Sequence, residues 1–335
     1  MTSCRGMSRV RGVVAVVVAA VVGTLMTTVA PVGAAASVPL STGSNSLGQL
    51  GSPGSGSRSI AGPVSVPRSV AIASGRDTAY ALDETGAIWA WGLNDKGQVG
   101  DGTNTNRPTP VKLGLTDVVA IEAGHYHALA IRSDGTVWAW GYGALGQLGL
   151  GTTNNRNVPT RVPGLSGITQ VAGGRDMSYA LRSDGTVLAW GSNALGEVGD
   201  GTTTRRNSPV VVANLSGVVE ISGGRNHALA RLANGTVRAW GDNQYGQLGD
   251  GTTTRRTSPV AVSNLSGVAH VDAGAHHSVA VRTDGAVLTW GRGYRGQLGL
   301  GSTSNRPTPT VVPGVPASVE VGDGRDQDLR HHRQR

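Results

Sequence analysis

The chain has 335 residues, of which 52 are Gly, 7 are Trp and 1 is Cys, and it contains no Phe. Gly is therefore about twice as common as its usual share of ~7%, yet it does not recur at every third position, which excludes a collagen-like chain. With 15% charged residues and a net charge of +8, the composition argues against a disordered chain. The lone Cys4 excludes an internal disulfide and a cysteine-held metal centre. Abundant Gly, Val, Thr and Trp favour strands and turns over helices.

Residues 1–36 have the order of a secretory signal peptide. Three Arg residues precede an apolar run over residues 13–22, and small residues follow as far as Ala36. This order predicts cleavage after Ala34 or Ala36 and a secreted protein, either extracellular or associated with the cell wall. An uncleaved membrane anchor is the alternative, but the apolar run is shorter than the ~20 residues that a span prefers. No membrane span is expected after cleavage.

A repeat of about 50 residues organises the rest of the chain, residues 37–335. Each copy contains Trp-Gly followed by a Gly-Gln-Leu-Gly-like element, and the recurring Trp residues are Trp91, Trp140, Trp190, Trp240 and Trp290. The first Gly of the second element recurs as Gly97, Gly146, Gly196, Gly246 and Gly296. A degraded sixth copy has Thr42 at the Trp position. We expect the Trp residues to fill the wedges between neighbouring units, and the Gly residues to permit φ > 0 or close backbone approach.

Period-two alternation within each copy predicts short antiparallel strands. Both Trp residues of Val137–Trp140 lie on one face, and Ser133–Thr136 has Asp-Gly at the centre of a hairpin signal. Each copy thus contains four predicted strands, of which the fourth ends near residue 42, 91, 140, 190, 240 or 290. The pattern predicts an all-β propeller of about six four-stranded blades.

The two ends of the repeat region are expected to complete one blade together. Strands near residues 307–312 and 319–321 would pair with the N-terminal strand near residues 38–42, which closes the ring and removes open sheet edges. The tail at residues 327–335 departs from the repeat, because polar and charged residues replace an apolar strand. Either this end is frayed, or the reading frame was lost or truncated there, so the closing blade is expected to be the weakest.

The Trp-Gly-x-Asn-x-x-Gly-Gln-Leu-Gly-x-Gly-Thr box, the Asp-Gly-x-Val hairpin and the Ala-Gly-x-x-His loop recur together from about Val38 to Asp326. This combination resembles the regulator of chromosome condensation repeat family. The resemblance implies a β-propeller, usually of seven blades, and the family's eukaryotic founder is a nuclear, chromatin-bound exchange factor for the small GTPase Ran. The signal sequence suggests a secreted, bacterial-type member instead. A second branch that is similar in architecture and export comprises secreted propellers that inhibit β-lactamases.

Two variable loops in each copy are candidates for partner binding. In the family, the loop after the recurring Gly lies on one face near the channel, and here its candidate contact residues are Arg76, Asp77, His125, Tyr126, Arg175, Asp176, Arg225, Asn226 and His276. The loop after Trp-Gly adds residue types that suit protein interfaces, namely Tyr142, Tyr245, Tyr294 and Arg295. Other recurring polar residues are expected to hold the framework, namely His127, His227 and His277 in the first loop and Asn94, Asn193 and Asn243 in the second.

Arg recurs in register after the Gly-Thr turn, as Arg107, Arg156, Arg206, Arg256 and Arg306. The family pattern favours a framework role for these residues over a basic ring. Aromatic residues do not interleave them and the net charge is modest, which argues against nucleic acid as the partner. The chain has no nucleophile elbow, phosphate loop or metal-ligand spacing, so no catalytic residue, cofactor or metal is predicted.

These observations favour an exported, non-enzymatic and monomeric propeller that binds a protein partner through one face. The sequence does not name that partner. Inhibition of a β-lactamase and guanine-nucleotide exchange on a GTPase are the two alternatives.

Overall fold

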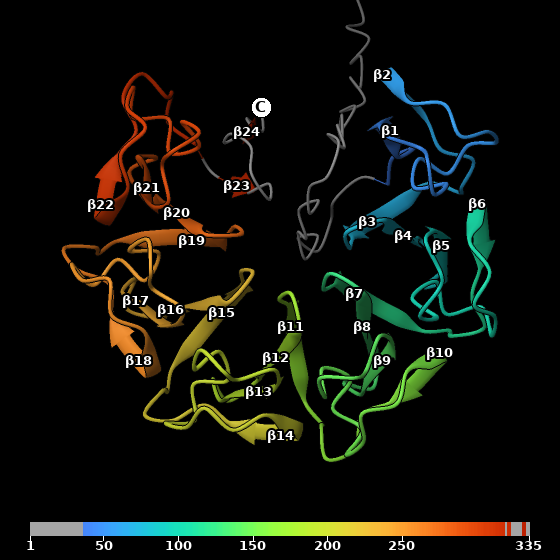
Figure 1. Ribbon diagram of the computed structural model, residues 1–335, viewed down its shortest axis with the longest axis horizontal. Coiled ribbons are helices and arrows are strands. Elements are labelled where there is room, and N and C mark those ends of the chain that lie inside the picture. The colour runs from blue at the N-terminus through green and yellow to red at the C-terminus, as the bar shows by residue number, and fades with distance from the viewer. Residues whose placement is uncertain (1–35, 319, 323–329, 333–335) are drawn as a thin grey trace, which may run out of the picture.

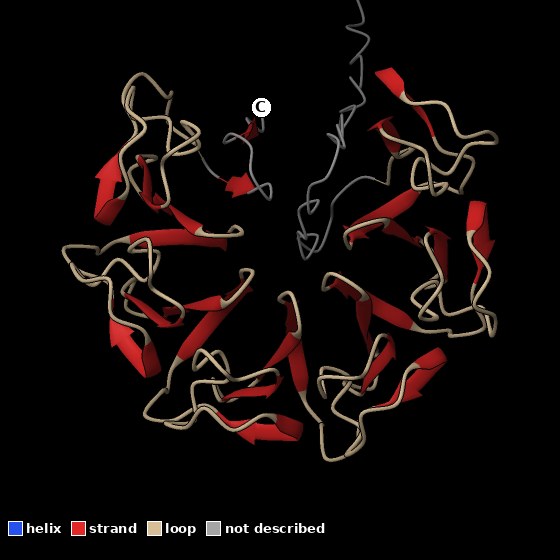
Figure 2. Cartoon of the chain, viewed as in Figure 1, coloured by secondary structure: helices blue, strands red, loops and turns tan. Residues whose placement is uncertain are grey.

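The computed structural model describes residues 36–318, 320–322 and 330–332, which form a ring of β-sheets around a central axis (Figure 1). These residues lie in strands, turns and loops, and none of them lies in a helix (Figure 2). Five four-stranded sheets and two two-stranded sheets follow one another in sequence order. The predicted all-β propeller is therefore confirmed, with five complete blades and a sixth divided between the two ends of the repeat. Apart from Ala36, the predicted signal peptide lies outside the described residues.

The complete blades are numbered here in chain order. Blade 1 contains β3 (Ser69–Ser74), β4 (Thr78–Asp83), β5 (Ile88–Gly92) and β6 (Arg107–Lys112). Blade 2 contains β7 (Val118–Ala123), β8 (His127–Arg132), β9 (Val137–Gly141) and β10 (Arg156–Arg161). Blade 3 contains β11 (Ile168–Gly173), β12 (Met177–Arg182), β13 (Val187–Gly191) and β14 (Arg206–Val211). Blade 4 contains β15 (Val218–Gly223), β16 (His227–Leu232), β17 (Val237–Gly241) and β18 (Arg256–Ala261). Blade 5 contains β19 (Val268–Ala273), β20 (His277–Arg282), β21 (Val287–Gly291) and β22 (Arg306–Val311).

Each complete blade is an antiparallel meander in which the Trp strand is the third strand, so the prediction that it is the fourth is wrong. In blade 1, Ala90 pairs with Tyr80 on one side and with Val111 on the other, so β5 lies inside the sheet. The sequence repeat that ends at the Trp strand therefore begins and ends one strand earlier than the sheet does. The physical reason is that the long loop after Trp-Gly returns the chain to the same sheet, whereas the short connection after the next strand leads into the following blade.

The outermost strand of every complete blade carries a Pro near its centre. These residues are Pro110, Pro159, Pro209, Pro259 and Pro309. Pro has no N–H group to donate to a further strand, and it is tolerated at sheet edges for that reason. Each outer strand pairs irregularly with its Trp strand, and this irregularity makes room for the pyrrolidine ring of the Pro. The rim of the propeller is thereby protected against edge-to-edge association.

The recurring Trp residues seal the joints between blades, as predicted. Trp140, Trp190, Trp240 and Trp290 are 0% exposed and Trp91 is 3% exposed. Each indole Nε1–H donates to a backbone carbonyl of the preceding blade, for example Trp140 to Gln98 O at 3.0 Å. The other four bonds are Trp91 to Gln49 O, Trp190 to Gln147 O, Trp240 to Glu197 O and Trp290 to Gln247 O, at 2.8–3.1 Å.

Both Gly residues of the Gly-Gln-Leu-Gly element are required by these joints. Gly97 has φ +79°, and a Cβ there would lie 2.6 Å from backbone atoms of Asn157 in the next blade. Gly100 has φ +85°, and a Cβ there would lie 2.6 Å from the indole nitrogen of Trp140. Only Gly adopts these angles without cost and lets a ring or a chain approach so closely. Gly146, Gly196 and Gly246 share the angle and the crowding of Gly97, whereas Gly296 shares the angle alone.

The joints use two side-chain arrangements, which alternate around the complete blades. At the joints between blades 1 and 2 and between blades 3 and 4, a Tyr hydroxyl donates to the carbonyl that accepts the indole bond, from Tyr80 to Gln98 O and from Tyr179 to Glu197 O. Each Tyr ring also meets the Trp ring of the next blade edge-on, with centroids 5.9 and 6.0 Å apart. Burial raises the pKa of both phenols above its ordinary value, so both remain neutral donors.

At the joints between blades 2 and 3 and between blades 4 and 5, a His–Ser pair replaces the Tyr. Ser178 Oγ donates to Gln147 O at 2.8 Å, and His127 Nε2 lies 2.8 Å from Ser178 Oγ. His227 and Ser278 repeat this geometry at 2.9 Å. Because the Ser proton is committed to the carbonyl, the Ser oxygen accepts from Nε2–H of a neutral imidazole. The framework role predicted for His127 and His227 is confirmed.

The His and Ser positions vary together along the chain. Where the His position holds Thr78 or Met177, the Ser position of the next blade holds Ala128 or Ala228. A buried Ser hydroxyl gains from a donor beside it, and Ala removes the need for one. The repeat therefore has a two-blade period in its joints that is superimposed on the ~50-residue period of its strands.

The terminal blade consists of β1 (Leu40–Gly43), β2 (Arg58–Pro63), β23 (Glu320–Gly322) and β24 (Arg330–His332). β1 pairs with β2 and β23 pairs with β24, but the described residues contain no hydrogen bond between these two sheets, and Figure 1 shows β23 next to blade 5 and β1 next to blade 1. The predicted pairing of terminal strands is therefore not among the described contacts. Thr42, at the Trp position, is buried and donates to Arg58 O at 2.7 Å within its own sheet, so it forms no joint of the indole type.

The C-terminal tail, residues 327–335, was expected to lack a strand, but three of its residues form β24. Val321 pairs with His331, whereas the equivalent Val171 pairs with Ala180, so the register of the tail is displaced by one residue. A displacement of one residue exchanges the two faces of a strand. The remaining tail residues lie outside the described part of the chain.

We predict that His227 and Ser278 are energetically coupled. The single changes His227→Met and Ser278→Ala should each lower the free energy of unfolding by about 1–2 kcal/mol, and the double change by about 1 kcal/mol less than their sum. The double variant reproduces the Met177–Ala228 pair, which lacks the bond, but keeps Leu229 where that joint has Tyr179. Chemical denaturation of the four proteins measures the coupling. The matched control combines His227→Met with Ser178→Ala, which belongs to another joint and should be additive; a coupling as large in the control would contradict the prediction.

We also predict that acid weakens the His joints. Burial lowers the pKa of His127 to about 4 and that of His227 to about 3. Neither Nδ1 atom has a hydrogen-bond partner among the described residues, so protonation would create a buried charged donor without an acceptor there. The unfolded chain binds these protons near pH 6.5. The free energy of unfolding should therefore be constant above about pH 6.5 and fall towards pH 4, by about 3 kcal/mol for each His.

Unfolding titrations over this range measure the pH effect. A variant with Met in place of both His127 and His227, and Ala in place of both Ser178 and Ser278, should lose that part of the pH dependence. An equal slope in the variant would show that carboxylates alone account for it.

Candidate functional site

The two variable loops of each blade lie on one end of the ring, which we call the loop face. The first loop joins strands one and two of a blade, and the third loop joins strands three and four. A backbone hydrogen bond connects them in every complete blade, for example from Leu93 N to Asp77 O and from Tyr142 N to Tyr126 O, both at 2.8 Å. The equivalent bonds in blades 3 to 5 run from Ser192 N to Asp176 O, from Asp242 N to Asn226 O and from Arg292 N to His276 O. The structure thus brings together the two predicted sets of contact residues.

Backbone bonds between blades join the first loops into a continuous inner row. Arg76 N donates to His125 O at 2.9 Å, and Arg175 N donates to Arg225 O at 3.3 Å. The recurring Gly that begins the loop permits this approach, since a Cβ at Gly75 would lie 2.8 Å from Gly124 O. The variable side chains therefore project from a backbone that is fixed on both sides.

The predicted contact residues differ in accessibility. Four are exposed, namely Arg76, Arg175, Tyr294 and Arg295. Eight are half-buried, namely Asp77, Tyr126, Tyr142, Asp176, Arg225, Asn226, Tyr245 and His276. His125 is 6% exposed, so its imidazole supports the loop instead of offering a free contact. The expectation that His125 forms part of the exposed surface is therefore wrong, because its ring packs edge-on beneath Tyr126, with centroids 6.2 Å apart.

The Tyr126 cluster spans blades 1 and 2 and comprises Arg76, His125, Tyr126 and Tyr142. The Arg76 guanidinium lies 5.8 Å from the centre of the Tyr126 ring and donates to the Tyr126 hydroxyl. Tyr126 and Tyr142 meet edge-on at 6.4 Å. Arg76 also forms an ion pair with Asp77 at 3.5 Å. The cluster therefore presents aromatic surface with its positive charge balanced.

The Tyr294 cluster spans blades 4 and 5 and comprises Tyr245, His276, Arg292, Tyr294 and Arg295. The Arg292 guanidinium lies 3.9 Å from the centre of the Tyr294 ring and 5.0 Å from that of Tyr245. Arg295 covers the same Tyr294 ring at 5.3 Å, and His276 meets Tyr245 edge-on at 5.3 Å. Arg292 lies in the same variable loop as the predicted contact residues Tyr294 and Arg295, and the structure shows that it joins the two Tyr rings.

Polar residues occupy the sector between the two clusters. Arg175 pairs with Asp176 at 3.1 Å, and Asn226 donates to the carboxylate of Glu197 at 3.1 Å. Burial raises the pKa of Asp176, while the charges of Arg175 and Arg225 oppose that effect. Glu197 occupies the position that is Gln in the other complete blades. This difference is visible in the sequence and could have identified Glu197 as a candidate contact residue.

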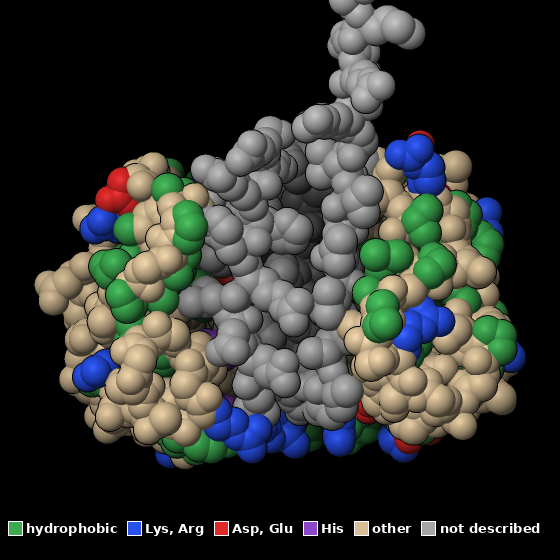
Figure 3. Space-filling view, turned by 90° about the horizontal axis from the view of Figure 1, so that it is seen from above, with side chains coloured by type: hydrophobic (Ala, Val, Ile, Leu, Met, Phe, Trp, Pro, Cys, Tyr) green, Lys and Arg blue, Asp and Glu red, His purple; other side chains and the backbone are tan. Residues whose placement is uncertain are grey.

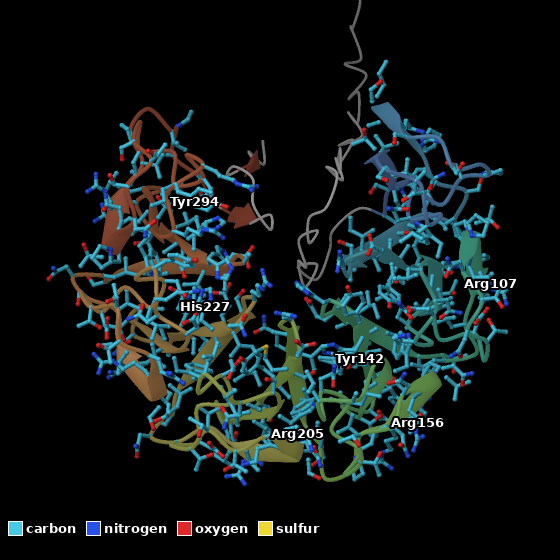
Figure 4. All side chains as sticks on the ribbon, viewed as in Figure 1. Arg107, Tyr142, Arg156, Arg205, His227 and Tyr294 are labelled. Carbon is cyan, nitrogen blue, oxygen red and sulfur yellow. The ribbon has the colours of Figure 1, made fainter. Side chains whose placement is uncertain are left out.

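The outer parts of the third loops have the predicted framework role. Asn94 accepts from Val99 N at 2.9 Å and donates to Thr105 O at 3.0 Å, and Asn193 and Asn243 repeat both bonds. Arg206 pairs with Asp200 at 2.6 Å, and Arg107 and Arg256 pair with Asp101 and Asp250 in the same way. In blades 2 and 5, Leu150 and Leu300 replace the Asp, so Arg156 and Arg306 lack this carboxylate. Figure 4 shows Arg107 and Arg156 near the outer circumference, away from His227.

The described residues contain no group of three or more His, Cys, Asp or Glu side chains that could hold a metal ion. No helix among them is long and apolar enough to cross a membrane. Lys and Arg side chains are dispersed over the surface shown in Figure 3, with some of them gathered along its lower edge. The chemistry that the loop face offers is aromatic packing, cation–π contact and hydrogen bonding.

Known structures share this architecture. Human WBSCR16 has a TM-score of 0.80 and 23% identity, over 94% of this chain and 85% of that one. Yeast RCC1 (Prp20) bound to Kap60 has a TM-score of 0.66 and 26% identity, over 76% of this chain and 66% of that one. Prp20p from Saccharomyces cerevisiae has a TM-score of 0.73 and 24% identity, over 85% and 75% respectively. None of the curated protein sequences matches significantly.

The sequence itself matches the RCC1-like domain over residues 40–328, which is most of the chain. This range covers all five complete blades and begins in the strand that carries Thr42. The boxes, the joints and the matched range agree: this chain belongs to the family of RCC1-like domains.

Proposed function

We propose that this protein is an exported, non-enzymatic module that binds a protein partner through its loop face. The observation that carries the proposal is the pair of Tyr–Arg clusters on that face. Tyr and Arg are enriched among the residues that dominate protein interfaces, because they combine large contact area with hydrogen bonding. The proposed export rests on the signal-like order of residues 1–36.

The rigid attachment of the loops supports this role. Every first loop is tied to the third loop of its own blade, and bonds between blades tie neighbouring first loops together. Side chains on a fixed backbone lose less conformational entropy on binding than side chains on a mobile loop. The loop face is therefore suited to bind a protein partner without rearrangement of its backbone.

Relatives offer a precedent for protein binding. Yeast RCC1 was solved in complex with Kap60, and Prp20p was studied for its binding to Gsp1p and histones. Exchange-factor activity on a GTPase is a second candidate, which the 26% identity to yeast RCC1 favours. Nucleotide release from a candidate GTPase tests it, and hydrolysis assays with a β-lactamase test the inhibitor alternative.

We predict that capture of the partner from culture medium depends on the loop face. A variant with Tyr126→Ala and Tyr294→Ala should lose affinity by at least about tenfold, because truncation of a Tyr at an interface centre commonly costs 2 kcal/mol or more. Quantitative mass spectrometry after capture on the immobilised full-length protein measures the loss.

The control for this experiment is Arg182→Ala, at the opposite ends of the strands, where Arg182 pairs with Asp184 on the surface. The control should capture the partner as the unchanged protein does. Equal capture by the Tyr variant and the unchanged protein would contradict the proposal.

A further inference from the structure

The loop face contains two Tyr–Arg clusters of similar composition whose charge balance differs. In the Tyr126 cluster, Arg76 has a carboxylate beside it in Asp77. The nearby Lys96 pairs with Asp95 at 2.9 Å, and Arg175 pairs with Asp176. Positive charge over blades 1 to 3 is therefore largely balanced within the loop face itself.

Arg292 in the Tyr294 cluster has no such partner. Among the described residues, no carboxylate forms an ion pair with it, and its buried Nε atom has no hydrogen-bond acceptor. The carboxylate in the neighbouring third loop, that of Asp242, is 7% exposed and accepts bonds from Gln244 N and from Gln247 Nε2. Asp242 is thereby occupied within its own loop.

Contacts with the Tyr245 and Tyr294 rings restrict the orientation of the Arg292 guanidinium. A guanidinium held between two Tyr rings presents its remaining N–H groups at the edge of the stack, in the fork geometry that suits a carboxylate. Tyr294 is 43% exposed and is the one aromatic side chain among the exposed large hydrophobic residues of the described chain. An unbalanced Arg therefore stands beside an accessible aromatic surface.

We propose that the Tyr294 cluster is the centre of the partner interface and that it binds an acidic protein segment, in which an Asp or Glu carboxylate meets Arg292 and an adjacent aromatic or aliphatic side chain packs on Tyr294. This proposal rests on the proposed function and names the chemistry of the partner. Charge complementarity supports it, because a partner carboxylate supplies the negative charge that no described carboxylate provides for Arg292. The balanced charge of the Tyr126 cluster favours a protein over a nucleic acid, which would need an extended positive surface.

A set of labelled peptides tests the proposal on the full-length protein. The probes are a peptide of repeated Glu-Tyr-Gly units, a matched peptide with Gln in place of Glu, and single-stranded DNA. Fluorescence anisotropy should show the Glu peptide binding at least about tenfold more tightly than the Gln peptide, and added salt should weaken binding of the Glu peptide.

Two matched variants locate the contact. Arg292→Gln should abolish the preference for Glu, and Arg292→Lys should restore part of it, because Lys keeps the charge but not the planar fork. Arg76→Gln, which removes an Arg from the balanced cluster, should leave the preference unchanged. Thermal unfolding of each variant establishes that it is folded.

Several results would overturn the proposal. These are absence of binding by the Glu peptide, equal binding of the Glu and Gln peptides, an equal effect of the Arg292→Gln and Arg76→Gln changes, or tighter binding of single-stranded DNA than of the Glu peptide. The proposed function fails separately. If capture of the partner depends on Tyr126 but not on Arg292, the loop face binds a protein and this inference is wrong. If the Glu peptide needs Arg292 but partner capture does not need the loop face, the proposed function is wrong.

Discussion

The indole–carbonyl bond at each joint is the interaction on which the rest of the structure depends. A single blade buries little apolar surface, so its stability comes from stacking against neighbours. The Trp residue fills the wedge between two blades, and its Nε1–H fixes the height of one blade against the backbone of the other. The accepting carbonyl belongs to the Gln or Glu of the third loop. The same bond that builds the core therefore also positions the loop face.

This coupling explains why the loop sequences vary in short blocks between invariant Gly residues. Gly100 and its equivalents leave no room for a side chain, because the indole lies against them. Between Trp-Gly and the next Gly, the second position is held by the framework Asn or by a crowded Gly, and the other positions change from blade to blade. A chain built in this way can alter the chemistry of one sector, such as that of Arg292 and Tyr294, without disturbing the joints.

The sequence predicted those parts of the fold that repeat. The ~50-residue spacing of Trp implied blades, the Asp-Gly signal implied the hairpin at Gly135, whose φ is +73°, and His127 and His227 were correctly assigned to the framework. The prediction that the Trp strand is the fourth strand of its sheet was wrong. A sequence repeat does not show where each sheet begins, because the hydrogen bonds between strands decide which strands form one sheet. The two-blade alternation of Tyr and His–Ser joints is visible in the sequence once the neighbouring position is known.

The functional surface was harder to predict for a physical reason. Residue type and loop position identified Tyr245 and Tyr294 as candidates, but their importance depends on which charges are balanced nearby. Arg76 and Arg292 each lie in a variable loop, and the sequence alone does not show that each contacts a Tyr ring. They differ because Asp77 follows Arg76 directly and pairs with it, whereas Asp242, in the adjoining third loop of blade 4, accepts a bond from Gln247 instead. In a propeller of repeated blades, binding specificity depends on which charged side chains in each part of the loop face are paired. Residues from two neighbouring blades determine that pairing, so the sequence of one repeat does not reveal it.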